Sequence, residues 1–168
     1  MCHMLQVNAG EHLNLGGHKR MSVFICHATG GRCEDWDPWV GSNQVILHDT
    51  LDDNMHDGPP TVRVYRRKRL TLDPVQDEHE LMEKVKSQGL AMVEALHQMK
   101  HDKLGGAAVW LTGEATPQSR SGPGPMRMLM QFTTDVIPFD ITAKGMGYVF
   151  IDPHDDSTNA AVMLWQGV

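Results

Sequence analysis

Short apolar stretches, rich in β-branched and aromatic residues, occur at both ends of the chain and are separated by turn-forming residues. Gly16 and Gly17 mark one of these turns. In Met126, Met128 and Met130 the methionines recur at every second position, as on one face of a strand. The pattern predicts strands over residues 1–8, 21–27, 44–48, 107–112, 126–133, 146–152 and 160–166, with a further strand in 61–72.

One long helix is predicted in the middle of the chain. Apolar residues there recur with a period near 3.6, acidic residues precede them, and Gly105 and Gly106 follow. The positions that form the apolar face are Leu81, Val85, Met92, Leu96 and Met99. Clustered strands with a single central helix predict an α+β fold that is mainly antiparallel β.

The end of the chain repeats its beginning. Gln6 and Gln131 lie 125 residues apart in similar blocks, and Val23–Ile25 recurs as Val149–Ile151. A third block aligns Val45–Leu47 with Val162–Leu164. These blocks predict one domain over residues 1–168, built from two similar β units at about 1–48 and 105–168, with a connector, a strand and the helix in 49–104.

Composition narrows the classes of function. The net charge of −6 and the pI near 5.9 argue against nucleic acid as the partner. Three cysteines do not make a disulfide framework and favour a reducing compartment. No secretory signal is visible, and the apolar runs are too short to span a membrane. We therefore expect a cytoplasmic protein that does not act at a membrane.

Several motifs in both halves resemble the YwqG-like family, a mainly bacterial group of unknown function. The resemblance implies an α+β fold of repeated β-rich units and implies no catalytic activity. Many relatives carry a Cys-x-x-Cys-Gly motif where this chain reads Pro117–Pro123 without a cysteine, so no metal is expected there. The motifs are Lys103–Gly106, Trp110, Thr116–Pro117, Pro125–Met126, Gln131, Gly145–Phe150 and Trp165–Gln166, with Gln6, Leu15–Gly17, Val23–Cys26, Trp36–Pro38 and Gly41–Asn43 in the first half.

The remaining metal candidates are Cys26, His27 and Cys33. A closed zinc site needs four ligands, and these residues supply three at an unusually long spacing. Cys26 is interpreted instead as a small hydrophobe at the end of a strand, and no metal or cofactor is expected. No nucleophile with a partner base, phosphate-binding loop or dinucleotide motif is present, so no catalytic residue is assigned.

Two features indicate a binding surface. Arg66, Arg67 and Arg69 belong to a basic run that suits a charged edge strand or a patch for an acidic partner. Trp36 and Trp39 stand beside acidic residues in a loop, where aromatic side chains either anchor interfaces or cap the core.

The sequence therefore predicts a non-catalytic binding protein whose partner is another protein, most concretely an immunity- or antitoxin-like protein. Two alternatives stay open. One is a metal-dependent or hydrolytic enzyme that uses the His-, Cys- and Asp-rich residues 26–57. The other is a binder of phosphate-bearing ligands through the basic strand 63–69.

Overall fold

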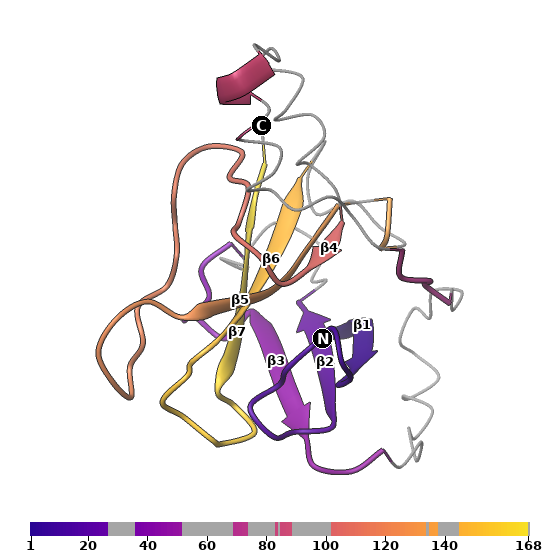
Figure 1. The fold of residues 1–168 in the computed structure, drawn as a ribbon. Coiled ribbons are helices and arrows are strands. Elements are labelled where there is room, and N and C mark those ends of the chain that lie inside the picture. Colours follow the sequence, from indigo (N-terminus) through magenta and orange to yellow (C-terminus); the bar gives the residue numbers. More distant parts are fainter. Residues whose placement is uncertain are drawn as a thin grey trace.

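The structure, a computed structural model, describes residues 1–26, 36–51, 69–73, 83, 85–88, 102–133, 135–137 and 145–167. Two antiparallel sheets make up this part of the chain (Figure 1). The first sheet has the order β1-β2-β3 and the second the order β4-β5-β6-β7. The strands are β1 (Cys2–Asn8), β2 (Arg20–Ile25), β3 (Asn43–His48), β4 (Lys103–Leu104), β5 (Arg127–Thr133), β6 (Met146–Ile151) and β7 (Ala161–Gln166).

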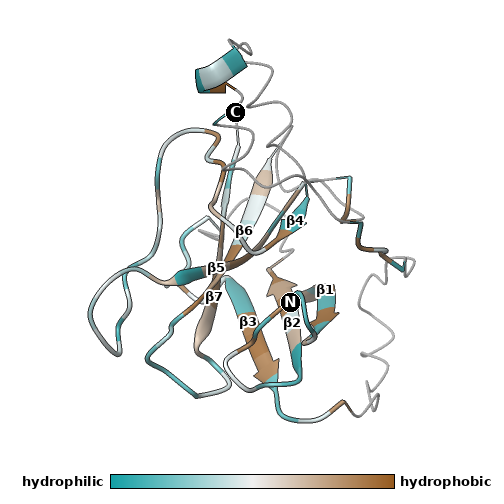
Figure 2. Ribbon diagram, in the orientation of Figure 1, coloured by the Kyte–Doolittle hydropathy of each residue, from teal (hydrophilic) through white to brown (hydrophobic). Residues whose placement is uncertain are grey.

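A hydrophobic core between the sheets joins them. In β2, β3, β6 and β7, alternate residues face inward, as the geometry of a β-strand requires. At one border β3 lies beside β7 (Figure 1), and the N–H of Leu47 donates a hydrogen bond of 2.8 Å to the carbonyl of Thr158. Hydrophobic stretches of β2 and β3 stand out against hydrophilic connecting loops in Figure 2. The inner residues of the strands include Met21, Val23, Val45, Leu47, Phe132, Val149, Ile151 and Met163.

The internal repeat predicted from the sequence has a structural counterpart. β1 and β5 each span seven residues, begin 125 positions apart and contain a bulge at equivalent places, around Met4 and Leu129. Leu5 pairs with Val23 in the first sheet, as Met130 pairs with Val149 in the second. The bulges, the register and the strand lengths therefore agree between β1-β2-β3 and β5-β6-β7.

Two details of the predicted repeat are wrong by one residue. Val23 pairs with Val45 and Val149 pairs with Met163, so Val45 corresponds to Met163 and not to Val162. Such a slip reverses which face each side chain occupies. The bulge in β5 likewise breaks the single face predicted for the methionines, because Met128 and Met130 pack in different hydrophobic clusters.

The predicted α+β class, with its long central helix, is also wrong. In the described part of the chain the structure is nearly all β, helical residues are limited to Glu83 and residues 85–88, and no helix reaches seven residues. An amphipathic helix draws most of its stability from packing its apolar face. Among the described residues, both hydrophobic clusters consist of strand and loop residues only.

Candidate functional site

Two loops and the end of β7 enclose an open groove of about 580 Å³. One loop, residues 36–39, belongs to the connection between β2 and β3, and the other, residues 112–117, leads toward β5. The two walls come from the first and second repeats, respectively. We call this site the tryptophan groove; its lining residues are Trp36, Asp37, Pro38, Trp39, Thr112, Ala115, Pro117, Leu164, Trp165, Gln166 and Gly167.

The 36–39 loop holds two indoles at the surface. Trp36 is 52% exposed and Trp39 is 39% exposed, which is unusual for such large apolar side chains. The carboxylate of Asp37 accepts a hydrogen bond of 2.8 Å from the backbone N–H of Trp39. This local turn, followed by Gly41 at a φ of 78°, fixes the shape of the loop. The exposure of the indoles is thus built into an ordered turn.

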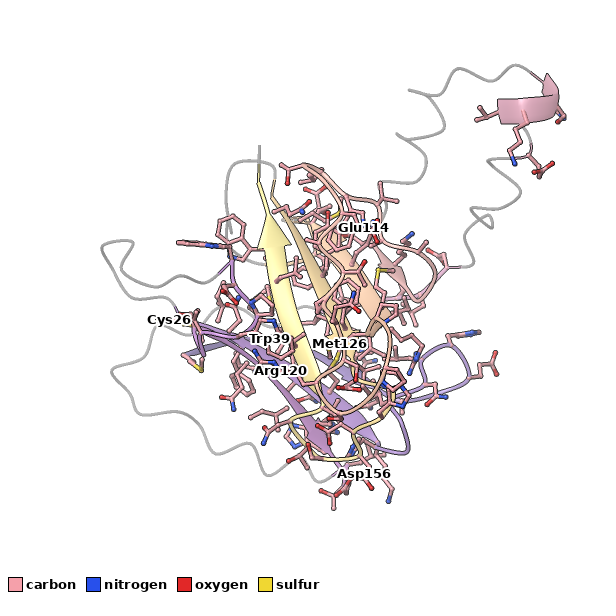
Figure 3. The ribbon with its side chains drawn as sticks, turned by 90° about the vertical axis from the view of Figure 1, so that its left-hand side faces the viewer. Cys26, Trp39, Glu114, Arg120, Met126 and Asp156 are labelled. Carbon is pink, nitrogen blue, oxygen red and sulfur yellow. The ribbon has the colours of Figure 1, made fainter. Side chains whose placement is uncertain are left out.

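Arg120 forms the rim of the groove. Its guanidinium carbon lies 3.6 Å from the centroid of the Trp39 ring, in a cation–π contact (Figure 3). In the part of the chain that the structure describes, no ion pair to Arg120 is found. A positive charge therefore lies over one exposed indole, while Asp37 supplies a negative charge nearby.

Asp152 fixes the loop that carries Arg120. Its carboxylate accepts hydrogen bonds from the Ser119 hydroxyl at 2.7 Å, from the N–H of Arg120 at 3.0 Å and from the N–H of Ser121 at 3.3 Å. The N–H of His154 donates a fourth at 3.0 Å. Burial raises the pKa of Asp152, but these hydrogen bonds outweigh burial and hold that pKa at about 2. An ionised, buried carboxylate therefore holds the loop that places Arg120 at the rim of the groove.

The floor of the groove contains two residues of β7. The side-chain oxygen of Gln166 accepts hydrogen bonds from the N–H groups of Leu111 and Thr112, and its amide nitrogen donates to the carbonyl of Gly113. The indole nitrogen of Trp165 is buried and has no hydrogen-bond partner among the described residues. This nitrogen has almost no accessible surface, so it is not counted among the groups that a ligand in the groove could contact.

Next to the groove, residues 107–111 cover the outer face of the second sheet; we call them the covering segment. The strand predicted over residues 107–112 is wrong. Hydrogen bonds from side chains, and not the pairing of strands, hold this segment. The side-chain oxygen of Gln131 accepts a 3.0 Å hydrogen bond from the backbone N–H of Val109. The hydroxyl of Tyr148 donates a 2.9 Å hydrogen bond to the backbone carbonyl of Val109. Trp110 stacks on Phe150, with ring centroids 5.9 Å apart.

Two pKa values reflect the packing around this segment. Burial raises the pKa of Tyr148 to about 12, with the backbone of Leu111 acting in the opposite direction. Burial also lowers the pKa of Lys103 to about 8; its ammonium donates a 2.6 Å hydrogen bond to the carbonyl of Ala107. Both groups serve to hold the covering segment against the sheet.

The structure brings only some of the predicted site residues together. Trp36 and Trp39 line one groove. Arg69 is exposed but does not line the groove. Cys26 is half-buried and does not line the groove either; its N–H donates a 2.7 Å hydrogen bond to the carbonyl of Ser42. The other predicted residues, His27, Cys33, Arg66 and Arg67, lie outside the described residues. Within the described part, no three His, Cys, Asp or Glu side chains are grouped as a metal site would require.

Sequence reasoning missed Arg120 and Asp152. Their contacts join loops that are far apart in the chain, and no spacing rule reveals such a pair. Trp165 and Gln166 were noticed only as parts of a family motif. Asp152 does have one local signal, because an Asp directly after a buried strand and before Pro153 is a typical turn former.

No family model matches the chain, and no curated protein or solved structure matches it significantly. The resemblance to the YwqG-like family therefore stays a prediction from the sequence. In the described residues, no helix has the length and apolar character needed to cross a membrane.

Proposed function

We propose that this chain is a non-catalytic protein-binding domain whose partner docks on the tryptophan groove. The observation that carries the proposal is the pair of exposed indoles, Trp36 and Trp39, with Arg120 stacked on the second. Tryptophan and arginine are the side chains most enriched among residues that dominate binding energy. Here they occur together on a rim built by both repeats.

The chemistry of the groove favours a polypeptide as the ligand. Its walls are mostly apolar and aromatic, its polar lining residues are Asp37, Thr112 and Gln166, and the guanidinium of Arg120 lies over Trp39 at its edge. An apolar side chain of a partner would pack against the indoles. An acidic residue of the partner would face Arg120.

The immunity- or antitoxin-like role is the specific form of this proposal, in which the partner is a toxin. An acidic domain with a net charge of −6 suits a basic partner surface, such as that of a nuclease toxin. Co-expression with the product of a neighbouring gene is the direct assay, and failure of every neighbour to bind would remove this specific role.

Replacing both Trp36 and Trp39 with alanine is expected to abolish capture of the partner without unfolding the domain, because neither side chain belongs to a hydrophobic cluster of the core. Each single replacement is expected to weaken binding about 30-fold, the equivalent of about 2 kcal/mol. The measurement is affinity capture from a lysate of the source organism, followed by calorimetric titration with the purified partner.

A matched control exists on the same molecule. Leu70 and Leu72 are 45% and 61% exposed and lie outside the groove, so the Leu70→Ala/Leu72→Ala variant removes comparable exposed apolar surface elsewhere. The groove proposal requires a protein retained by the wild type and by this control but lost with the tryptophan variant. Retention of the same proteins by all three variants contradicts it.

One observation favours a hydrolytic enzyme as the second candidate. The Nε2 atom of His48 lies 3.0 Å from the hydroxyl of Ser22, as in a nucleophile–base pair. However, Ser22 is only 4% exposed, and a nucleophile must reach its substrate. We therefore favour binding, and labelling of Ser22 by a fluorophosphonate probe would reverse that preference.

A further inference from the structure

The outer faces of the two sheets are equivalent in register but differ in how well they are covered. The pairings of the two repeats make Gln6 equivalent to Gln131, Phe24 to Phe150, and Ile46 to Leu164. In the second sheet all three of these side chains are buried. In the first sheet all three equivalents remain half-exposed.

The covering segment explains the burial on the second sheet. It uses little sequence-specific chemistry: one side-chain amide and one hydroxyl hold its backbone at Val109, and one indole stacks on Phe150. An extended chain with a single aromatic side chain therefore suffices to seal such a face.

The first sheet keeps two of the groups that perform these tasks. Gln6 stands where Gln131 accepts the backbone N–H, and Phe24 stands where Phe150 receives the indole. Ser22 stands at the place of Tyr148, but it is buried and its hydroxyl lies 3.0 Å from Nε2 of His48, so we assign it no contact with a ligand. The ring of His3 is tilted against Phe24, with centroids 5.1 Å apart, and extends the aromatic surface.

We propose that the outer face of the first sheet binds an extended segment of a partner protein in the way that the second sheet holds residues 107–111. The segment places an aromatic side chain on Phe24. Its backbone N–H donates to the side-chain oxygen of Gln6. This surface is separate from the tryptophan groove, so the inference does not depend on the function proposed for that groove.

The chain itself supplies the probe for a test. A capped peptide with the sequence of residues 107–113 is titrated into the full chain labelled with ¹⁵N, and a second peptide with alanine at the place of Trp110 is the control. Saturable shifts are expected for the amides of Gln6, Phe24 and Ile46. The alanine peptide is expected to bind at least about tenfold more weakly.

Variants of the protein separate this site from others. Phe24→Ala is expected to weaken peptide binding about tenfold, and Gln6→Ala, which removes the proposed acceptor, is expected to weaken it as well. Unchanged amide signals from β5 and β6 establish that each variant keeps its fold. The proposal is overturned by shifts confined to the second sheet or to the groove, by absence of saturable binding, or by equal binding of the two peptides. It is also overturned if both variants bind as the wild type does.

Discussion

Replacing Gly147 with methionine is expected to lower the free energy of unfolding by about 3 kcal/mol. A side chain at this position of β6 has no space, because a Cβ atom there would lie 2.6 Å from Cε2 of Phe132. Phe132 is completely buried and pairs directly with Gly147 across the sheet. The aromatic ring occupies the volume that the glycine leaves free, so any added carbon forces the ring out of its place. Urea denaturation followed by circular dichroism measures the loss.

The first repeat provides the compensating change. Its equivalent pair is Val7 and Met21, a medium side chain opposite a large one where the second repeat has Phe132 opposite Gly147. Phe132→Val alone leaves a cavity and is expected to cost about 3 kcal/mol. The double variant Phe132→Val/Gly147→Met copies the first pair and is expected to recover at least about 1 kcal/mol of the summed losses.

A glycine with open surroundings is the control for this prediction. Gly10 has no atom within 4 Å of the position that a Cβ would take, and its φ is not in the left-handed region. Gly10→Ala is therefore expected to change the free energy of unfolding by no more than about 0.5 kcal/mol. Equal losses for Gly10→Ala and Gly147→Met, or strict additivity in the double variant, would show that Gly147 and Phe132 do not share one volume.

The same pair illustrates what the sequence reveals about the fold. Apolar blocks such as Val23–Ile25 and Val149–Ile151 predict strands well, because burial on one face imposes their pattern. The bulges at Met4 and Leu129 are not visible in that pattern, since an inserted residue leaves the composition of a strand unchanged. The first repeat has Val7 opposite Met21 where the second has Phe132 opposite Gly147, so the two sequences look unrelated at these equivalent positions.

The helix prediction failed for a different physical reason. Period and capping describe how a helix would form in residues 81–99, but not whether a surface is available for its apolar face. In the described part of the chain, the inner face of the second sheet packs on the first sheet and its outer face on the covering segment. The segment itself was predicted as a strand because its apolar residues resemble one, and no local rule predicts capture by Gln131 and Gln166.

The sequence predicted one wall of the candidate site but not the other. Trp36 and Trp39 were predicted as binding residues because large aromatics in an acidic loop are unusual. The opposite wall and the rim depend on contacts between loops, such as Arg120 on Trp39, that only the fold creates. Asp152 does not line the groove and acts on its rim through the Ser119–Ser121 loop that it holds.

Replacing Asp152 with alanine is expected to lower the free energy of unfolding by about 2 kcal/mol, because it leaves the donors of Ser119, Arg120, Ser121 and His154 without their acceptor. Without these hydrogen bonds the loop no longer holds Arg120 on Trp39. The variant is therefore expected to bind a groove ligand more weakly even where it is fully folded. Thermal and urea denaturation measure the first effect and calorimetry the second. Asp156→Ala, an exposed aspartate in the same loop, is the matched control and is expected to change neither.

The ionisation of Asp152 adds a pH dependence with a fixed sign. Its pKa is lowered from the usual 3.8 to about 2 in the folded protein, so the unfolded chain binds the proton more tightly. The stabilisation is therefore complete above about pH 4 and is lost as the pH falls toward about 2. Asp152→Asn has no carboxyl group to titrate, so it should be less stable than the wild type at neutral pH and the difference should shrink across this window. A constant difference between the two proteins down to pH 2 would mean that the Ser119–Ser121 loop does not depend on the charge of Asp152, and the proposed link from this carboxylate to Trp39 would then fail.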